Sequence, residues 1–494
     1  MTTKKNNVVN SSILMISASW LAKALGLIST IILARLLTPN DFGLVSIVML
    51  VIYFFNIFSE TGCKQYLLSL PEVTNQELNT AWTLNIISKT IISGVIMLFA
   101  PYSASFFSEP QLTMTLYVSA LIPFINGLEN PAIYLAKRNF NYQGIFKLNL
   151  ISKIISFTIT ISLAYYLKSH WALIFGTLTH FSLMTIGSYF IMPFKPSFSL
   201  KQIKKQWDYS KWIFVRGLVG YTRAKIDTFI LAKSFLTAEL GLFNVAKEFA
   251  MLLQEQIAMP LQDIVMTSVQ KVKGNEQNVA SVIEKFSTLL VCLILPAVIG
   301  LAMLSDKVML VVLGEQWLDA APLLAVLAIL GFSTSLVVVL SAALSALSKT
   351  KLIFQLDLIT TSLILVILVL SRNLDITTFA MVRSLLGFVV LFGYLLALRF
   401  VIKLRLLKYL VNMIPALLAS TAMYFTLKLS QPSYLEPTVL NLISLILIGA
   451  LSYLMIFLPT MNRMQKYSIS LQFVNQQIML IFDKTRNLIL RNKH

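Results

Sequence analysis

Five basic side chains lie deep within long apolar stretches of this sequence: Lys23, Lys89, Lys153, Arg223 and Lys225. A lysine or arginine in the middle of a bilayer costs roughly 2.5–3.5 kcal/mol on insertion scales, so such a residue faces a cavity or a partner and not lipid. Several cations around one cavity favour an anion, and a diphosphate offers multiple oxygens that lysine and arginine can bind together. The five residues are therefore predicted to line an anion-binding cavity.

Acidic residues on the same stretches leave alternatives open for these cations. Arg223 and Asp227 are four residues apart and could pair along one helix, so for Arg223 an ion pair and a ligand role are both open. The three deep lysines have no acidic residue within one helical turn, but each could pair with a carboxylate on another helix. An ion gradient could also act through carboxylates in this region, and the candidates are Glu129, Asp227 and Glu255.

The sequence contains no motif for catalysis or for metal or cofactor binding. There is no G-x-x-x-x-G-K-[ST] phosphate loop, no H-E-x-x-H and no D-x-D pair. Cys63 and Cys292 are far apart and lack the spacing of metal ligands. His170 and His180 are isolated and His494 ends a tail, so a histidine-based catalytic site has little support. We therefore predict no catalytic residue, no metal, no cofactor and no ATP-driven transport within this chain.

The composition indicates which solvent surrounds the helices that carry these residues. Of 494 residues, 57% are hydrophobic and 12% are charged, and the mean hydropathy is +0.78. A soluble protein carries about 25% charged residues, so most of this surface faces lipid. The net charge of +19 would suggest nucleic acid in a soluble protein, but here the basic residues concentrate in short loops on one side of the predicted membrane. We predict membrane lipids, and no nucleic acid, as partners.

Hydropathy divides the chain into about fourteen stretches that are long enough to span a bilayer as helices. Their approximate bounds are 13–35, 42–59, 81–100, 112–135, 145–167, 171–192, 212–232, 241–265, 282–304, 321–347, 352–371, 377–398, 409–428 and 438–459. If the N-terminus is cytoplasmic and the spans alternate, 25 basic residues fall in inside loops and six in outside segments. This asymmetry satisfies the positive-inside rule and predicts an all-α, multi-pass membrane protein with both termini in the cytoplasm.

An internal repeat relates the two halves of the chain. The segment 32–47 aligns without gaps on 230–245, an offset of 198 residues, and Gly43 is matched with Gly241. Six spans separate the copies, so both enter the membrane in the same direction, as parallel repeats do. Chance similarity among apolar residues is the alternative, but a match between polar turns is less expected by chance than a match between leucines. We predict two six-helix lobes plus two C-terminal helices, with a substrate site between the lobes.

The predicted parts of the chain follow this repeat. They are an N-terminal lobe at 1–194, a basic cytoplasmic linker at 195–211, a C-terminal lobe at 212–403, two additional transmembrane helices at 404–460 and a basic cytoplasmic tail at 461–494. In the linker and the tail, apolar and aromatic residues alternate with lysine and arginine, as in helices that lie on an anionic inner leaflet. A charge cluster that only sets topology is the alternative for both segments.

Three short segments resemble motifs of a known family. They are 33–44 (LARLLTPNDFGL), 135–142 (LAKRNFNY), and 313–317 (LGEQW) followed by 321–324 (APLL). In their order and spacing they resemble the Wzx-type polysaccharide and O-antigen flippases, closest to the colanic-acid exporter branch. That family belongs to the multidrug/oligosaccharidyl-lipid/polysaccharide (MOP) exporter superfamily.

The resemblance implies a flippase of the bacterial inner membrane. Such a protein moves an undecaprenyl-diphosphate-linked oligosaccharide repeat unit from the cytoplasmic to the periplasmic leaflet by alternating access, for O-antigen, capsule or exopolysaccharide biosynthesis. Related flippases bind the diphosphate with basic residues of a central cavity, and Lys23 best matches that pattern here. The implied partner is a polyprenyl-diphosphate-linked oligosaccharide, and the polysaccharide polymerase machinery is a further candidate.

Two other functions are compatible with a multi-pass chain. A drug exporter of the same superfamily would share the two-lobe fold, but cationic drugs need an anionic cavity, whereas the deep charges here are mainly basic. A membrane-embedded glycan polymerase or glycosyltransferase would need a sizeable outside loop with catalytic residues. The longest outside loop, 305–320, carries Asp306, Glu315 and Asp319, and an enzyme would have to use these acids.

Overall fold

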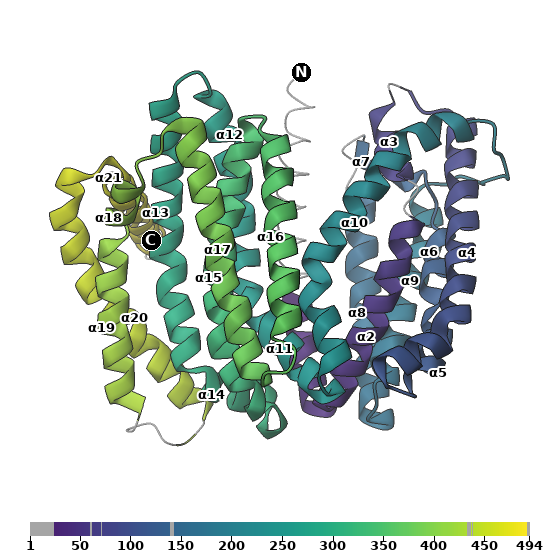
Figure 1. Cartoon of the computed structure of the whole chain (residues 1–494), viewed down its shortest axis with the longest axis horizontal. Helices are drawn as coiled ribbons and strands as arrows, with labels where there is room; N and C mark the ends of the chain where they lie inside the picture. The colour runs from purple at the N-terminus through teal and green to yellow at the C-terminus, as the bar shows by residue number, and fades with distance from the viewer. Residues whose placement is uncertain are drawn as a thin grey trace. The chain divides into compact units, whose positions relative to one another are not determined.

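The computed structural model describes residues 24–59, 62–70, 72–138, 143–431, 436 and 438–491, and at 137, 205, 207–219 and 481–491 it describes the backbone alone. Every regular element in these ranges is a helix (Figure 1). Ten of the helices are long and apolar enough to cross a membrane, and two shorter apolar segments cover Ala24–Leu36 and Leu112–Gly127. The predicted all-α membrane fold is confirmed, and the count of fourteen spans stays a prediction.

The chain divides into two compact units, residues 1–244 and 245–494. In the first unit the helix Ala24–Leu36 is followed by α2 (Pro39–Phe58), α3 (Cys63–Ser69), α4 (Asn75–Phe107), α5 (Leu112–Ser119), α6 (Leu121–Gly127), α7 (Ile133–Arg138), α8 (Gln143–Leu167), α9 (Trp171–Ile191) and α10 (Ile203–Ser234). The next helix, α11 (Thr237–Leu253), begins in the first unit and continues into the second.

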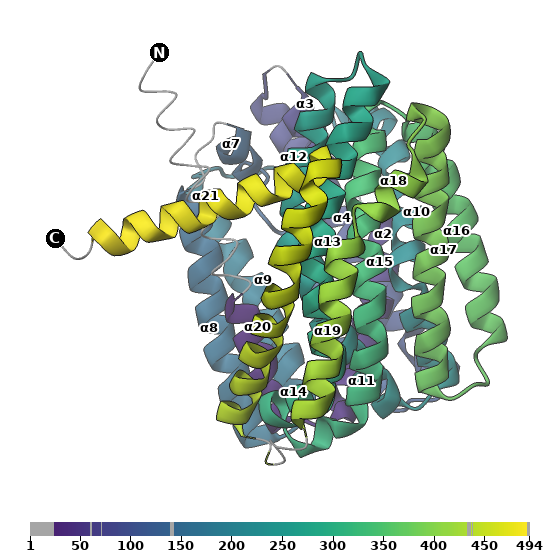
Figure 2. The ribbon, with the colours of Figure 1, turned by 90° about the vertical axis from the view of Figure 1, so that its left-hand side faces the viewer.

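The second unit is built around one enclosed helix. Its elements are the π-helical turn Gln254–Ala258, α12 (Met259–Lys271), α13 (Glu276–Met303), α14 (Ser305–Val308), the short turns Met309–Leu313 and Glu315–Ala320, α15 (Ala321–Ala346), α16 (Thr350–Leu370), α17 (Ile376–Ile402), α18 (Leu406–Val411), α19 (Ile414–Ser430), α20 (Val439–Met464), the short turn Gln465–Tyr467 and α21 (Ile469–Arg491). Helix α15 is the most enclosed candidate span. Helix α21 runs across the end of α20 instead of continuing along it (Figure 2).

Close helix packing depends on small residues, as is usual where lipid removes a hydrophobic drive for association. A Cβ atom on Gly387 of α17 would lie 2.3 Å from the Ser333 hydroxyl of α15, and one on Gly331 of α15 would lie 2.6 Å from the Ala250 carbonyl of α11. In the first unit, a Cβ on Gly176 of α9 would lie 1.8 Å from the Thr160 hydroxyl of α8. These glycines let the helix backbones approach closely.

Prolines explain where the predicted spans are interrupted. The predicted span 112–135 is broken in the structure: α6, which contains Pro123, ends at Gly127, and a turn around Pro131 precedes α7. The predicted span 241–265 is continuous, but a π-helical turn precedes Pro260. Because proline lacks an N–H and its ring clashes with the preceding turn, the helix must bend, end or rearrange its hydrogen bonds there.

The turns of the two repeat copies pack against each other within the first unit. A Cβ atom on Gly43 would lie 1.8 Å from the Thr237 carbonyl oxygen, and a Cβ on Gly241 would lie 1.9 Å from the Pro39 carbonyl oxygen. Gly241 and Thr237 are the equivalents of Gly43 and Pro39 at the offset of 198 residues. The contact is therefore reciprocal, as a two-fold relation between the copies would make it. Only glycine fits at either position. We call this contact the glycine seam.

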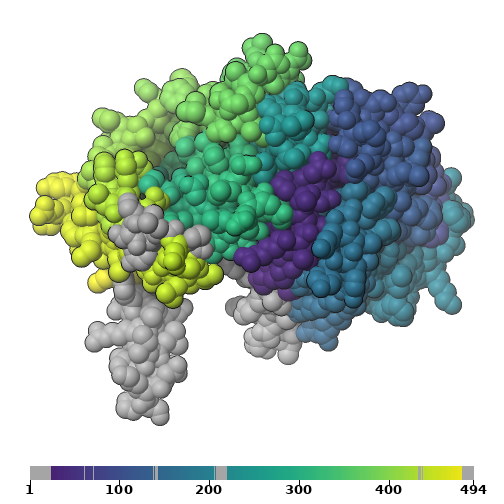
Figure 3. Space-filling view, turned by 90° about the horizontal axis from the view of Figure 1, so that it is seen from below, coloured from purple at the N-terminus to yellow at the C-terminus, as the bar shows by residue number. Residues whose placement is uncertain are grey.

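Equivalent acids cap the two helices that begin at the seam. The Thr38 N–H donates to the Asp41 carboxylate (3.0 Å), and the Leu236 N–H donates to the Glu239 carboxylate (3.0 Å). Asp41 also accepts the His170 N–H (2.8 Å) at the turn between α8 and α9. Figure 3 views this end, where the chain near residue 40 (purple) lies against the blue α8–α9 turn. Capping acids thus fix both turns next to the seam.

The packing units differ in extent from the predicted lobes. Helix α10, which starts the predicted C-terminal lobe, packs in the first unit, where the Tyr221 hydroxyl donates to the Leu50 carbonyl of α2 (2.6 Å). The predicted lobes follow the sequence repeat and not the packing. The boundaries at 194, 211, 403 and 460 therefore stay predictions.

Candidate functional site

The structure places four of the five predicted cations, and Lys23 lies outside the described residues. Lys89 is half-buried on α4 and Lys153 is half-buried on α8. On α10, Arg223 is exposed and Lys225 is half-buried. Of these, Lys153 lines a pocket that also contains a histidine and hydroxyl groups. That all five cations share one cavity stays a prediction.

The pocket that contains Lys153 lies within the first unit, between the helix Ala24–Leu36, α8 and α9, and has a volume of about 270 Å³. Its described lining residues are Leu25, Gly26, Ser29, Leu33, Lys153, Ser156, Phe157, Thr160, Leu173, Gly176, Thr177 and His180. We call it the Lys153 pocket. Lysine, histidine and hydroxyl groups on membrane-spanning helices are suited to a polar ligand, because lipid cannot solvate them.

Two helices build this pocket with the same residue spacing. From α8 it takes positions 153, 156, 157 and 160, and from α9 it takes positions 173, 176, 177 and 180. Both sets follow the pattern i, i+3, i+4, i+7, which places residues on one face of a helix. The packing of Gly176 against Thr160 brings these two faces together.

His180 also lines this pocket, and its place there cannot be predicted from the sequence, in which it is isolated. In the structure its ring lies near enough to Lys153 for the two groups to interact electrostatically, and it also interacts with the Ser152 backbone. The signal that could have found it is the matching spacing of polar residues on 153–160 and 173–180. That comparison requires knowing that these two spans pack together.

The predicted ion-coupling acids occupy three different environments. Glu129 is half-buried and accepts the Tyr134 hydroxyl (3.3 Å), Asp227 on α10 is fully buried, and Glu255 is exposed on the π-helical turn. Arg223 and Asp227 do lie one turn apart on α10, as the spacing predicts. Roles for these acids in ion coupling, and an ion pair between Arg223 and Asp227, stay predictions.

His170, also judged isolated from the sequence, belongs to a buried polar cluster at the glycine-seam end of the first unit. Besides the backbone bond to Asp41, its Nδ1 lies 3.6 Å from that carboxylate and its Nε2 lies 3.2 Å from the Thr115 hydroxyl. The cluster joins α2, α5 and the start of α9. The cluster supplies hydrogen-bond donors to the buried Asp41 carboxylate, so the role of the cluster is structural.

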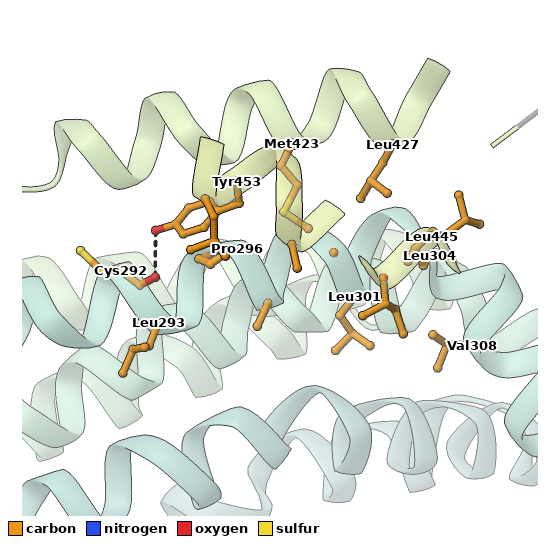
Figure 4. Close-up of a pocket in the computed structure, with 15 residues that line it drawn as sticks. Cys292, Leu293, Pro296, Leu301, Leu304, Val308, Met423, Leu427, Leu445 and Tyr453 are labelled. Atoms are coloured by element: carbon orange, nitrogen blue, oxygen red, sulfur yellow. Dashed lines mark hydrogen bonds between the residues drawn. The ribbon is translucent and has the colours of Figure 1, made fainter. Parts of the chain in front are cut away.

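A second pocket, of about 500 Å³, lies in the second unit between α13, α19 and α20 (Figure 4). Its wall is made of side chains such as Leu301, Met423 and Leu445. The Tyr453 hydroxyl at its edge donates to the Cys292 carbonyl (2.9 Å), so this polar group is already satisfied. No charged residue is among the described lining residues, and the pocket suits hydrocarbon and not a sugar or a phosphate.

Comparison with known proteins places these features in a family. The model of the family described as "Polysaccharide biosynthesis protein" matches residues 32–322. The "Lipopolysaccharide biosynthesis protein WzxC" of Escherichia coli (strain K12) is 22% identical over 356 residues, which cover 71% of this chain and 72% of that protein. The "Teichuronic acid biosynthesis protein TuaB" of Bacillus subtilis (strain 168) is 24% identical over 415 residues, covering 81% and 85% of the two chains.

Solved structures share the fold at low sequence identity. The structure "Lipid II flippase MurJ, inward closed conformation" superposes with a TM-score of 0.74 at 15% identity, covering 90% of this chain and 98% of that one. A multidrug resistance MATE family transporter of the MOP superfamily, in an inward-facing conformation, gives a TM-score of 0.57 at 12% identity, covering 77% and 94%. The chain therefore shares its fold with MurJ and with this MATE family transporter. The family model matches more than half of this chain, and this multi-pass membrane protein therefore belongs to the polysaccharide biosynthesis protein family.

Proposed function

We propose that this protein is a flippase that moves an undecaprenyl-diphosphate-linked oligosaccharide repeat unit from the cytoplasmic to the periplasmic leaflet of a bacterial inner membrane. The observation that carries the proposal is the family match over residues 32–322. The names of the relatives and the MurJ-like fold point the same way. The deep basic residues supply the chemistry that a diphosphate requires.

The proposed mechanism follows from the cost of moving a charged headgroup through hydrocarbon. Lys23 binds the diphosphate, assisted by Lys89, Lys153 and either Arg223 or Lys225. The sugars occupy a hydrated cavity and the prenyl tail remains in lipid. Neutralising a buried dianion with several cations removes most of the solvation penalty that prevents spontaneous flipping. Rocking of two lobes then exposes the site on the other side.

The orientation and the partners belong to the same proposal. Both termini are cytoplasmic, as the 25-to-six distribution of basic loop residues favours. The product is delivered to the periplasmic leaflet, where a polysaccharide polymerase would consume it. The protein transports its substrate without changing it chemically, and Glu129, Asp227 or Glu255 couples transport to an ion gradient.

The enzyme alternative depends on the acids of the predicted outside loop. In the structure residues 305–320 form α14 and two short helical turns, and Trp317 is fully buried there. Asp306, Glu315 and Asp319 are all exposed. Catalytic carboxylates normally work in a cleft whose burial tunes their pKa values, so this arrangement favours transport.

A deletion strain of the source bacterium tests the proposed function. We expect the complete but unpolymerised undecaprenyl-diphosphate oligosaccharide to accumulate on the cytoplasmic face, together with loss of surface polysaccharide. Mass spectrometry of extracted lipids would identify the repeat unit, and complementation with the intact gene is the control. Unchanged surface glycan with no accumulated intermediate, in a strain without a second flippase gene, would contradict the proposal.

A further inference from the structure

We propose that the Lys153 pocket is a phosphoryl-binding site in which His180 and nearby hydroxyl groups act together with Lys153. The inference rests on the proposed function, which supplies a diphosphate as the ligand, and adds to it the groups that would hold a phosphoryl oxygen. It assigns a ligand-binding role to His180, Ser156 and Thr177, which the mechanism above does not use.

The charge of the lining determines the class of ligand. Lys153 and His180 are the ionisable groups among the described lining residues, and no carboxylate is among them. Lysine provides three N–H donors, and a histidine ring provides one in its neutral form and two when protonated. Donors and positive charge among the described lining residues suit an oxyanion, and a phosphoryl group is the oxyanion that the proposed substrate carries.

The hydroxyl groups are placed to add donors to the same ligand. At present each donates to a backbone carbonyl on its own helix: Ser156 to Lys153 (3.1 Å) and Thr177 to Leu173 (2.7 Å). The helix does not depend on these side-chain hydrogen bonds to the preceding turn, because its carbonyl groups already accept backbone N–H groups. Rotation of either hydroxyl would exchange this bond for a stronger charge-assisted bond to a phosphoryl oxygen.

The size of the pocket limits the ligand to a small group. Its volume of about 270 Å³ is below the roughly 300–1,000 Å³ of pockets that enclose drug-sized ligands. One or two phosphoryl groups would fit, whereas an oligosaccharide would remain outside. Gly26 forms part of the wall, and a Cβ atom there would lie 3.5 Å from Lys153 Nζ. A longer side chain at position 26 would therefore occupy the ligand's place.

Binding of inorganic pyrophosphate to the purified full-length protein tests this site directly. Isothermal titration calorimetry at constant ionic strength is expected to show saturable pyrophosphate binding. The Lys153→Gln variant is expected to bind pyrophosphate about tenfold more weakly or worse, because a hydrogen bond to a charged group contributes about 1.5–3 kcal/mol. His180→Gln is expected to weaken it less. The matched control is Lys147→Gln, which removes the same charge from an exposed position on α8 and should leave the affinity unchanged.

A second pair of variants keeps Lys153 in place. Gly26→Leu should fill the pocket and abolish pyrophosphate binding. Gly94→Leu on α4, where no atom lies within 4 Å of an added Cβ, should not affect it. Equal affinity in Lys153→Gln and Lys147→Gln, or equal affinity in the two leucine variants, would overturn the proposal. So would an absence of saturable binding to folded wild-type protein.

Competition distinguishes the two sources of a phosphoryl group. If farnesyl diphosphate displaces pyrophosphate and farnesol does not, the pocket binds the lipid headgroup. If neither displaces it, the pocket binds a free phosphate or pyrophosphate, which also supports the site. These titrations measure binding without transport. They can therefore fail in a protein whose deletion still causes lipid-linked oligosaccharide to accumulate, and the failure of the site is then distinct from failure of the proposed function.

Discussion

Replacing Gly43 with alanine is expected to reduce export of surface glycan strongly, and Gly241→Ala is expected to do the same. Either Cβ atom would lie within 2 Å of a backbone oxygen of the opposite turn, and the turns would have to separate by at least about 1.2 Å to relieve the contact at Gly43. In the predicted orientation the glycine seam lies at the periplasmic end. Alternating access requires that end to close while the site is open to the cytoplasm.

The size of this effect follows from the cost of overpacking. Inserting a methyl group into a well-packed contact costs about 1–3 kcal/mol, which shifts a two-state equilibrium by roughly 5- to 150-fold. A change of that size in the closed state would remove most transport without preventing insertion. Surface polysaccharide per amount of membrane-inserted protein is the measurement.

Matched glycines provide the control for the seam. Gly94→Ala on α4 and Gly220→Ala on α10 add the same methyl group where no atom lies within 4 Å, so both variants should export normally. Equal export by Gly43→Ala and Gly94→Ala at equal protein levels would show that the seam does not have to close tightly.

Neutralising Lys23 is expected to abolish export while the protein still inserts into the membrane. The proposed mechanism gives this residue the main contact with the diphosphate. Without the positive charge of Lys23, the dianion would be incompletely neutralised in a low-dielectric site. The Lys23→Ala variant, expressed at the native level in the deletion strain, should lack surface glycan and accumulate the lipid-linked repeat unit. Quantitative immunoblotting of the membranes would establish its level.

Two further variants separate a specific role of Lys23 from a general effect of charge. Lys23→Arg keeps the cation and should retain part of the export, although arginine differs in shape and donor geometry. Lys147→Gln removes a charge from an exposed position and should export normally. Normal surface glycan in the Lys23→Ala strain would show that the diphosphate is bound elsewhere.

The fold class could be predicted from sequence because the bilayer imposes strong and simple constraints. A membrane-spanning segment must form its backbone hydrogen bonds internally and expose apolar side chains to lipid. Segment length and hydropathy therefore locate the helices. The structure places α2, α8, α9, α13 and α17 close to their predicted bounds.

Other details of the helices depend on backbone chemistry that hydropathy does not record. The break between α6 and α7 and the π-helical turn before Pro260 arise at prolines. The cap at Thr38 and Asp41, by contrast, is readable as a sequence pattern. The grouping of α10 with the first unit depends on tertiary contacts such as that of Tyr221 with Leu50, and the repeat gives no information on it.

The candidate site was predicted less completely than the fold. The cost of a charge in lipid singles out Lys153 in the sequence, and in the structure Lys153 lines a pocket together with His180. That this pocket binds the substrate stays a prediction. His180 and His170 cannot be identified from the sequence, because the groups they lie near, Lys153 and Asp41, are distant in sequence. Such partners can be recognised only after the packing of α8, α9 and α2 is known. The reciprocal contact at Gly43 and Gly241 also required the structure, although the repeat had already aligned the two residues.

Reconstitution of the purified protein tests the central claim most directly. Lipid-linked repeat units extracted from the deletion strain would be incorporated into both leaflets of proteoliposomes, with sodium and proton gradients imposed in turn. Membrane-impermeant periodate would then oxidise the sugars exposed on the outer leaflet. We predict that wild-type protein makes nearly all of the lipid-linked sugar accessible with time, whereas vesicles with Lys23→Ala protein or no protein stay at the outer-leaflet share. An accessible fraction that remains at the outer-leaflet share with wild-type protein, under every gradient, would contradict the account.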